Sequence, residues 1–166
     1  MSKSNLRVGF SYDVHRLEEG NGFILGGEKI DCEFKTIAHS DGDVVYHALG
    51  EAILGSLALG DLGTFFPPSD PQFKDMDSSK IILKAKEEIA KKGYEVSNVD
   101  VSIILEKPKI ASKILAMRKN VCRLLDLDLE DVSIKCGTNE RLDSLGKSEG
   151  IGAFATVLVI KSDTIL

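Results

Sequence analysis

The chain has 166 residues, of which 43% are hydrophobic and 28% charged, values typical of a globular protein, and we expect one domain over residues 1–166. The formal net charge of -5 argues against a broad nucleic-acid-binding surface, and no run of about 20 apolar residues suggests a membrane helix. Three widely spaced cysteines and an N-terminus without an apolar run favour a cytoplasmic protein with reduced thiols.

The first half of the chain contains strand patterns followed by a helix. Residues 6–12 alternate as a strand does and lead directly into Asp13-Val14-His15. Residues 23–30 predict a short hairpin around Gly26-Gly27. Residues 40–43 carry capping side chains ahead of a helix that we expect to end near Leu59. The proline-rich residues 63–71 are expected to form a loop.

The second half alternates helices and strands. Asp77-Ser78 predict the start of a helix that ends near Lys92, and Pro108 is expected to open a helix that runs to about Leu125. Strands are predicted over 96–106, 132–138 and 151–161. This alternation predicts an α/β or α+β fold, with a mixed sheet of the four-stranded type packed against helices on one face.

The histidines suggest a metal site. Asp13 and His15 lie two apart on a predicted strand, so both side chains leave the same face. A carboxylate oxygen and an imidazole nitrogen placed in this way suit zinc, whose catalytic sites use three protein ligands and one open position. The third ligand is expected from His39 or His47. Glu51, one helical turn after His47, either supports that ligand or pairs with it in a purely structural contact.

Two segments suggest phosphate and polyol binding. His39 precedes a helix start, where unpaired backbone N–H groups suit a phosphate, although Ser40 or Asp41 could simply cap the helix while His39 faces solvent. Asp61 lies in a glycine-rich turn, where it either accepts hydrogen bonds from a polyol or only closes the turn.

Later residues suggest further contacts to phosphate. Thr138 is expected to donate to a phosphate oxygen, and Glu140 to bind a hard cation such as magnesium. Lys107 and Lys109 flank Pro108 and either attract phosphates or are solvated surface charges.

Several motifs occur in one order along the chain. Together they strongly resemble the 2-C-methyl-D-erythritol 2,4-cyclodiphosphate synthase family of the non-mevalonate isoprenoid pathway, over nearly the whole chain. The motifs are Asp13-Val14-His15, residues 38–43, His47-Ala48-Leu49, residues 59–63, Phe66-Pro67, Asp70-Pro71, residues 98–101, Pro108-Lys109 and Glu149-Gly150-Ile151.

The resemblance implies a phosphorus–oxygen lyase. In that family, the 2-phosphate of 4-diphosphocytidyl-2-C-methyl-D-erythritol 2-phosphate attacks the β-phosphate, so that CMP leaves and the cyclic diphosphate forms. Such a reaction requires a folded substrate and neutralised charge at phosphorus, which metals and oriented donors provide. The resemblance also implies a homotrimer with active sites between neighbouring subunits.

The resemblance assigns roles residue by residue. Asp13, His15 and His47 would bind zinc, His39 and Thr138 would stabilise the transition state, and Glu140 would bind magnesium or manganese with the diphosphate. The full substrate-binding set would be Asp13, His15, His39, Ser40, Asp61, Leu62, Gly63, Phe66, Pro67, Pro68, Ser69, Asp70, Leu105, Lys107, Pro108, Lys109, Ala111, Gly137, Thr138, Asn139, Glu140, Ser144 and Lys147.

The chain departs from the family pattern near its C-terminus. Gly137 replaces a threonine hydroxyl, and Asp143, Ser144 and Lys147 replace glycine, phenylalanine and arginine. Asp143 is a tolerable replacement if that position is left-handed, because aspartate visits this region more readily than most residues. Two alternatives stay open: a binding protein that keeps the fold and the zinc, and a zinc-dependent phosphodiesterase of other specificity.

Overall fold

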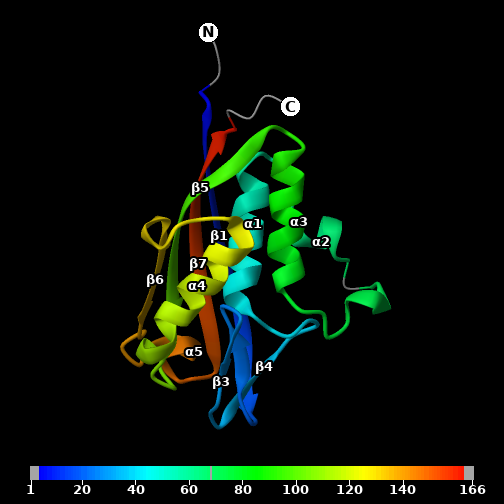
Figure 1. Ribbon diagram of the computed structural model, residues 1–166. Coiled ribbons are helices and arrows are strands. Elements are labelled where there is room, and N and C mark those ends of the chain that lie inside the picture. The colour runs from blue at the N-terminus through cyan, green and yellow to red at the C-terminus, as the bar shows by residue number, and fades with distance from the viewer. Residues whose placement is uncertain (1–3, 68, 163–166) are drawn as a thin grey trace.

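The computed structural model describes residues 4–67 and 69–162. One layer is a five-stranded mixed sheet in the order β4-β1-β7-β5-β6 (Figure 1). The pair β5–β6 is parallel, whereas β1–β4, β1–β7 and β5–β7 are antiparallel. The strands are β1 (Leu6–Glu19), β4 (Phe34–Ile37), β5 (Tyr94–Ile104), β6 (Val132–Gly137) and β7 (Gly150–Lys161), and β2 (Phe23–Leu25) with β3 (Glu28–Ile30) forms a separate hairpin.

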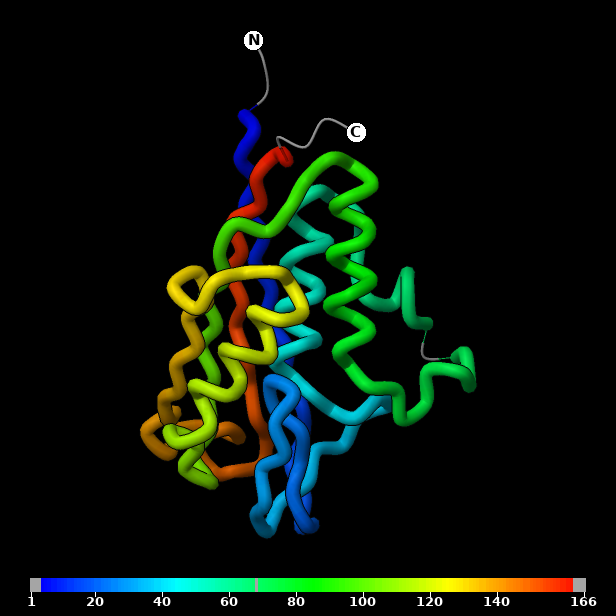
Figure 2. The backbone as a smooth tube through the Cα atoms, in the orientation of Figure 1, coloured from blue at the N-terminus to red at the C-terminus, as the bar shows by residue number. Residues whose placement is uncertain are grey.

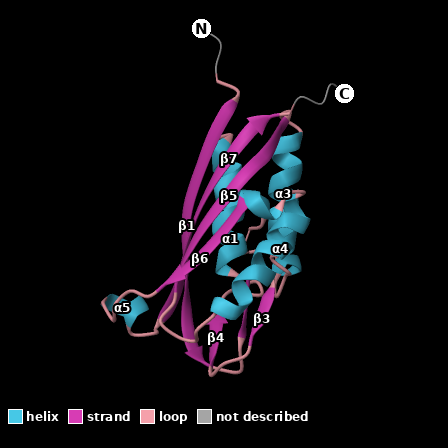
Figure 3. Cartoon of the chain, turned by 60° about the vertical axis from the view of Figure 1, so that its left-hand side comes forward, coloured by secondary structure: helices cyan, strands magenta, loops and turns pink. Residues whose placement is uncertain are grey.

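The three long helices lie on one side of this sheet (Figure 3). The three long ones are α1 (Val44–Ser56), α3 (Ser79–Ala90) and α4 (Ile114–Leu125), and two short ones are α2 (Leu62–Phe65) and α5 (Asp143–Gly146). The first residues of β1 and the last of β7 run side by side (Figure 2), since Leu6 pairs with Ile160. Among the described residues, no helix has the length and apolar character needed to cross a bilayer.

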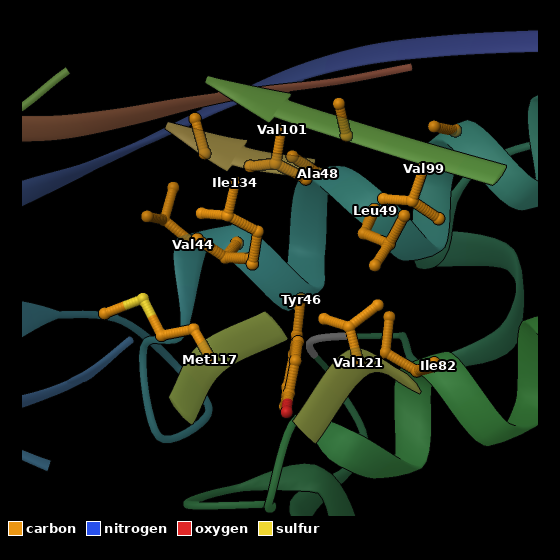
Figure 4. Close-up of a cluster of buried hydrophobic side chains, with 14 of the residues drawn as sticks. Val44, Tyr46, Ala48, Leu49, Ile82, Val99, Val101, Met117, Val121 and Ile134 are labelled. Carbon is orange, nitrogen blue, oxygen red and sulfur yellow. The ribbon is translucent and has the colours of Figure 1, made fainter. Parts of the chain in front are cut away.

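The hydrophobic core lies between the sheet and the long helices. Figure 4 shows Val101 of β5 and Ile134 of β6 directed toward α1, with Val121 of α4 on the other side of that helix. Val101, Val121, Leu49 of α1 and Ile82 of α3 are fully buried. Burial of this apolar surface is the main force that holds α1 against the sheet, and it fixes the position of the residues that α1 carries.

The opposite face of the sheet is apolar and exposed in the single chain. Successive side chains of a strand point to opposite faces, so every second residue of β1 faces away from the helices. Phe154 of β7 stacks on Tyr12 with ring centroids 4.5 Å apart. The exposed side chains of this sheet face are Leu6, Val8, Phe10, Tyr12, Val14 and Phe154.

Helix α1 packs closely on β1 at Gly9, where an added Cβ would lie 1.8 Å from the carbonyl oxygen of Ala52. We expect Gly9→Ala to lower the free energy of unfolding by about 3 kcal/mol, because the helix would have to move from the sheet. Gly55→Ala is the matched control, since its Cβ would meet nothing within 4 Å and would raise helix propensity. Urea unfolding of both variants tests this expectation, and an unchanged stability of Gly9→Ala would contradict it.

The expected fold class is confirmed, namely a mixed sheet packed against helices on one face. The expected number of four strands was too low, because β4 adds a fifth strand that pairs with the end of β1. Four residues carry too little alternation to be recognised as a strand. The hairpin around Gly26-Gly27 is confirmed, and both glycines have positive φ.

Two helix boundaries differ from those expected. Helix α1 ends at Ser56 instead of Leu59, because Ala58 adopts a left-handed φ of 55°. Helix α4 begins at Ile114 instead of Pro108, since Leu105 N donates to Gly137 O and the chain continues beside β6 before it turns. The expected loop over 63–71 is helical at its start, because residues 63–65 belong to α2.

Candidate active site

Asp13, His15 and His47 meet between β1 and α1. The two residues of β1 lie on the face that α1 covers, and His47 lies in the first turns of the helix. Asp13 Oδ2 is 3.1 Å from His15 Nε2 and 3.2 Å from His47 Nδ1. One ligand atom from each residue lies within 4.8 Å of the others, a grouping that fits one metal ion. Two imidazole nitrogens and a carboxylate oxygen are a donor set that zinc accepts.

The far nitrogens of both rings are also engaged. His15 Nδ1 is 2.9 Å from Gly42 O, and only a ring N–H can donate to a carbonyl, so Nε2 keeps its lone pair in the neutral ring. His47 Nε2 is 2.9 Å from Ser40 Oγ and 3.2 Å from Ser78 Oγ. These contacts turn His15 Nε2 and His47 Nδ1 toward Asp13.

The expectation that Glu51 supports or pairs with His47 is wrong. Glu51 instead accepts hydrogen bonds from Ser11 Oγ at 2.9 Å and from Leu62 N at 3.4 Å. Since β1 and α1 run past each other, Asp13 meets the turn that carries His47, and Ser11 meets the next turn. Glu51 therefore links β1 to the start of α2.

The cluster is electrostatically suited to a cation. Burial would raise the pKa of Asp13, but hydrogen bonds and charge from His15 and His47 outweigh burial and hold that pKa below its ordinary value. Burial lowers the pKa of His15, but Asp13 outweighs this effect and raises it. Asp13 is thus an ionised carboxylate, the form that binds metal.

Asp43 fixes the start of α1. It is 0% exposed, and its Oδ1 accepts from the backbone N–H groups of Gly26, Val45 and Tyr46. Its Oδ2 accepts from Gly27 N at 2.7 Å. One buried carboxylate therefore caps the helix and binds the β2–β3 turn to it, which places His47 one turn further on. Of the capping residues 40–43, the helix cap is Asp43 and not Ser40 or Asp41.

A cavity of about 170 Å³ opens beside the cluster. Five of its lining residues besides His47 were predicted to bind substrate, namely His39, Ser40, Leu62, Gly63 and Phe66. Three apolar lining residues were missed, namely Phe73, Met76 and Ile81. In sequence they look like ordinary core or loop residues. In the structure Phe73 makes an edge contact with Phe66, at 5.3 Å between centroids, and all three side chains line the same cavity.

Other predicted residues of this region have local contacts. Asp61 caps α2, since its Oδ1 accepts from both Thr64 N and Thr64 Oγ1 at 3.0 Å. Asp70 accepts from Gln72 N, and Pro67 O accepts from Asp70 N, so the loop that contains Ser69 closes on itself. Pro68 lies outside the described residues. Substrate contacts for these residues stay predictions.

A second cavity of about 170 Å³ is lined by other residues of the predicted substrate-binding set. Leu105, Pro108, Lys109, Ala111, Gly137 and Thr138 line it, together with Ile110, Ile114 and Cys136, which were not predicted. Lys107 is exposed in the loop that borders the cavity. No residue lines both cavities, and in Figure 1 α2 and β6 lie on opposite sides of the chain.

The turn after β6 carries the remaining candidates. Glu106 accepts from Asn139 N at 2.9 Å and Arg141 N at 3.0 Å, and Thr138 Oγ1 lies 3.3 Å from Glu140 Oε1. Asp143 has a φ of 53°, which confirms the left-handed conformation considered for this position. Ser144 in α5 and Lys147 just after it are not among the lining residues of the two cavities.

The chain is similar to known proteins over nearly its whole length. Residues 6–160 match the YgbB family. The chain is 45% identical to the 2-C-methyl-D-erythritol 2,4-cyclodiphosphate synthase of Clostridium tetani, over 95% of this chain and 99% of the relative. It superposes on the CDP complex of IspF from Plasmodium falciparum with a TM-score of 0.84 and 34% identity, covering 98% and 100% of the two chains. It superposes on the bifunctional IspDF of Campylobacter jejuni with a TM-score of 0.91 and 34% identity, covering 95% of this chain and 43% of that one.

Proposed function

The chain belongs to the YgbB family, and we propose that it acts as a 2-C-methyl-D-erythritol 2,4-cyclodiphosphate synthase at the cluster of Asp13, His15 and His47. It converts 4-diphosphocytidyl-2-C-methyl-D-erythritol 2-phosphate to the cyclic diphosphate and CMP, a step of the non-mevalonate pathway. The observation that carries this proposal is the convergence of three metal-binding side chains beside a cavity lined by His39 and Ser40.

We propose zinc as the metal, held by Asp13, His15 and His47. Three protein ligands leave a position for a diphosphate oxygen, as in catalytic zinc sites. When bound, the metal would withdraw charge from the diphosphate and orient it. We propose that Glu140 binds a second, harder cation such as magnesium or manganese with the phosphates.

The substrate supplies its own nucleophile. An oxygen of its 2-phosphate bonds to the β-phosphorus, the bond from that phosphorus to the oxygen bridging to the α-phosphate breaks, and CMP leaves with that oxygen. The 2-phosphate is already ionised, so the protein has to position groups and neutralise charge. We assign His39 and Thr138 to donate hydrogen bonds to the phosphates. Ser40, Asp61 and Gly63 hold the erythritol, where Asp61 accepts from a hydroxyl group, and the cavity of Leu105, Pro108 and Ala111 holds the cytidine.

We propose a homotrimer with active sites between neighbouring subunits. Two observations support it: the apolar sheet face that is exposed in the single chain, and the separation of the two cavities, each of which is lined by a different part of the assigned residues. Packing of the sheet faces would bury the apolar surface and bring one chain's metal cluster toward its neighbour's cytidine cavity.

Replacing Val8 and Phe10 by glutamate should therefore yield monomers without activity, since both side chains lie on the exposed sheet face. Light scattering after gel filtration measures the mass. The control is Leu83→Glu on α3, where an equally apolar side chain is 49% exposed away from that face. A monomeric wild-type protein with full turnover would contradict the shared sites.

We propose that the reaction takes place in the cytoplasm. All three cysteines are free, which suits a reducing compartment.

Phosphorus NMR of the reaction tests the proposed function. Purified protein with the cytidylyl substrate, zinc and magnesium should give CMP and the cyclic diphosphate in equal amounts, and EDTA should abolish both. Binding of substrate without CMP release would instead indicate a binding protein, and linear products would indicate a phosphodiesterase of other specificity.

A further inference from the structure

Two side chains behind His47 have no role in the reaction described above. Ser78, just before α3, is 0% exposed, and its Oγ lies 3.2 Å from His47 Nε2. The same Oγ lies 2.5 Å from Asp41 Oδ1. These contacts form a chain from a carboxylate through a hydroxyl to the ring of a metal-binding residue.

The direction of each hydrogen bond in this chain follows from the proton count. Serine has one O–H proton, and an ionised aspartate can only accept, so the proton of Ser78 lies toward Asp41. Ser78 Oγ can then only accept from His47, which makes Nε2 the protonated ring nitrogen. A neutral imidazole protonated at Nε2 has its lone pair at Nδ1, the nitrogen that faces Asp13 at 3.2 Å.

Asp41 is itself held in place. Its Oδ2 accepts from Ser78 N at 3.0 Å, its Oδ1 accepts from Asp43 N at 3.1 Å, and its own N–H donates to Met76 O at 3.1 Å. The Ser78 hydroxyl makes no capping bond to α3; Ser79 N is bound instead by Asp77 at 2.8 Å. The hydroxyl of Ser78 thus contacts Asp41, His47 and, at 3.4 Å, Ser40 Oγ, and it does not cap its own helix.

Ser40 also contacts His47 Nε2, at 2.9 Å, but it lines the cavity that we assign to substrate. Its hydroxyl is therefore available to a bound polyol. Ser78 is buried and does not line that cavity, so its contact with His47 does not change when substrate enters.

We propose that Asp41 and Ser78 are positioning residues for His47. The pair fixes the ring in the tautomer that is protonated at Nε2, so that Nδ1 is available to the metal. The inference rests on the proposed metal site, and it adds two residues to which no role has been assigned above. Outer partners of this kind usually contribute 10- to 100-fold to metal affinity.

Two variants interrupt the chain at different points. Ser78→Ala removes the buried acceptor, and we expect zinc to bind about 10- to 100-fold more weakly. Asp41→Asn is isosteric, but its amide can donate to Ser78 Oγ and so allow the serine proton to turn toward His47. We expect weaker zinc binding here as well. The double variant should bind zinc no more weakly than whichever single variant has the lower zinc affinity, because both changes break the same series of hydrogen bonds.

Zinc affinity, measured by competition with a chromogenic chelator, provides a readout that does not depend on turnover. Nitrogen-15 NMR of the zinc-loaded protein should show the ring proton of His47 on Nε2 in the wild type, with a changed signal in both variants. The control is Asp77→Ala, which removes the bond to Ser79 N at the start of α3 and leaves the contacts of His47 intact. It should lower stability without changing zinc affinity.

The outcomes separate the two proposals. If the wild type binds no zinc, the metal site and this inference both fail. If the wild type binds zinc and both single variants have zinc affinities within twofold of the wild-type value, only the positioning role is overturned. The same conclusion follows if Asp77→Ala weakens zinc binding as much as Ser78→Ala, because the effect would then be general support of α3.

Discussion

Replacing Asp13 by alanine should remove the bound metal and slow cyclisation by about a thousandfold or more, which corresponds to about 4 kcal/mol of lost transition-state stabilisation. Asp13 is the centre of the cluster, since the same carboxylate oxygen contacts both His15 and His47. Without it, two imidazoles remain, and no carboxylate is left among the proposed ligands. Elemental analysis for zinc and CMP release measured on the same sample test the two effects together.

The control for this variant is Asp31→Ala. Asp31 has a side chain that is 81% exposed and pairs only with Lys29 among the described residues, so its loss should change neither zinc content nor rate. A zinc-free Asp13→Ala protein that cyclises at the wild-type rate would contradict the assignment of the ligands.

Replacing Asp43 by alanine should lower the free energy of unfolding by about 4 kcal/mol or more. The carboxylate is fully buried and accepts from four backbone N–H groups, so its loss leaves several buried donors unsatisfied at the start of α1. A lost helix cap alone costs about 1 kcal/mol, and each buried unsatisfied donor adds about 1–3 kcal/mol. His47 should also become less well placed, so zinc affinity should fall.

Urea unfolding of metal-free protein measures this effect, because bound metal would add its own stabilisation. Asp128→Ala is a suitable control, since Asp128 precedes a short helical turn and makes no side-chain capping bond. The control should change stability by less than about 0.5 kcal/mol at the same protein concentration. Equal stabilities of the two variants would contradict the role of Asp43.

The metal cluster was predictable because its signals are local. A spacing of two residues on a strand places Asp13 and His15 on one face whatever the rest of the fold does. The choice between His39 and His47 as third ligand could not be made from spacing. That choice depends on how α1 lies against β1, and the resemblance to a known family decided it in favour of His47. The register of α1 against β1 cannot be read from the sequence. This is why Glu51 was expected to contact His47, whereas in the structure it accepts a hydrogen bond from Ser11.

The contacts around the metal cluster join residues far apart in the chain, and no local sequence pattern predicts them. Ser78 reaches His47 because the loops before α1 and α3 are bonded to each other, through Asp41 N to Met76 O and Asp75 N to His39 O. These residues lie more than 30 positions apart along the chain, and a serine before a helix looks like an ordinary cap. Phe73 and Ile81 were missed for the same reason, since apolar residues near a helix start resemble core.

The fold class was predictable from the alternation of strands and helices, whereas element ends were not. The departure at Asp143 is the exception, because the family's glycine at this position suggested a left-handed backbone, which aspartate tolerates, and the φ of 53° agrees with it. Strand β4 and the late start of α4 depend on pairing with distant strands, which a single sequence does not reveal.

The measurement that tests the central claim most directly is a zinc titration of metal-stripped protein, with cyclic diphosphate and CMP followed by phosphorus NMR. If cyclisation takes place at the cluster of Asp13, His15 and His47, turnover should rise in proportion to added zinc and level off at one zinc per chain, while His47→Ala should stay inactive throughout. Full turnover before any metal is added, or an active His47→Ala protein, would contradict the account.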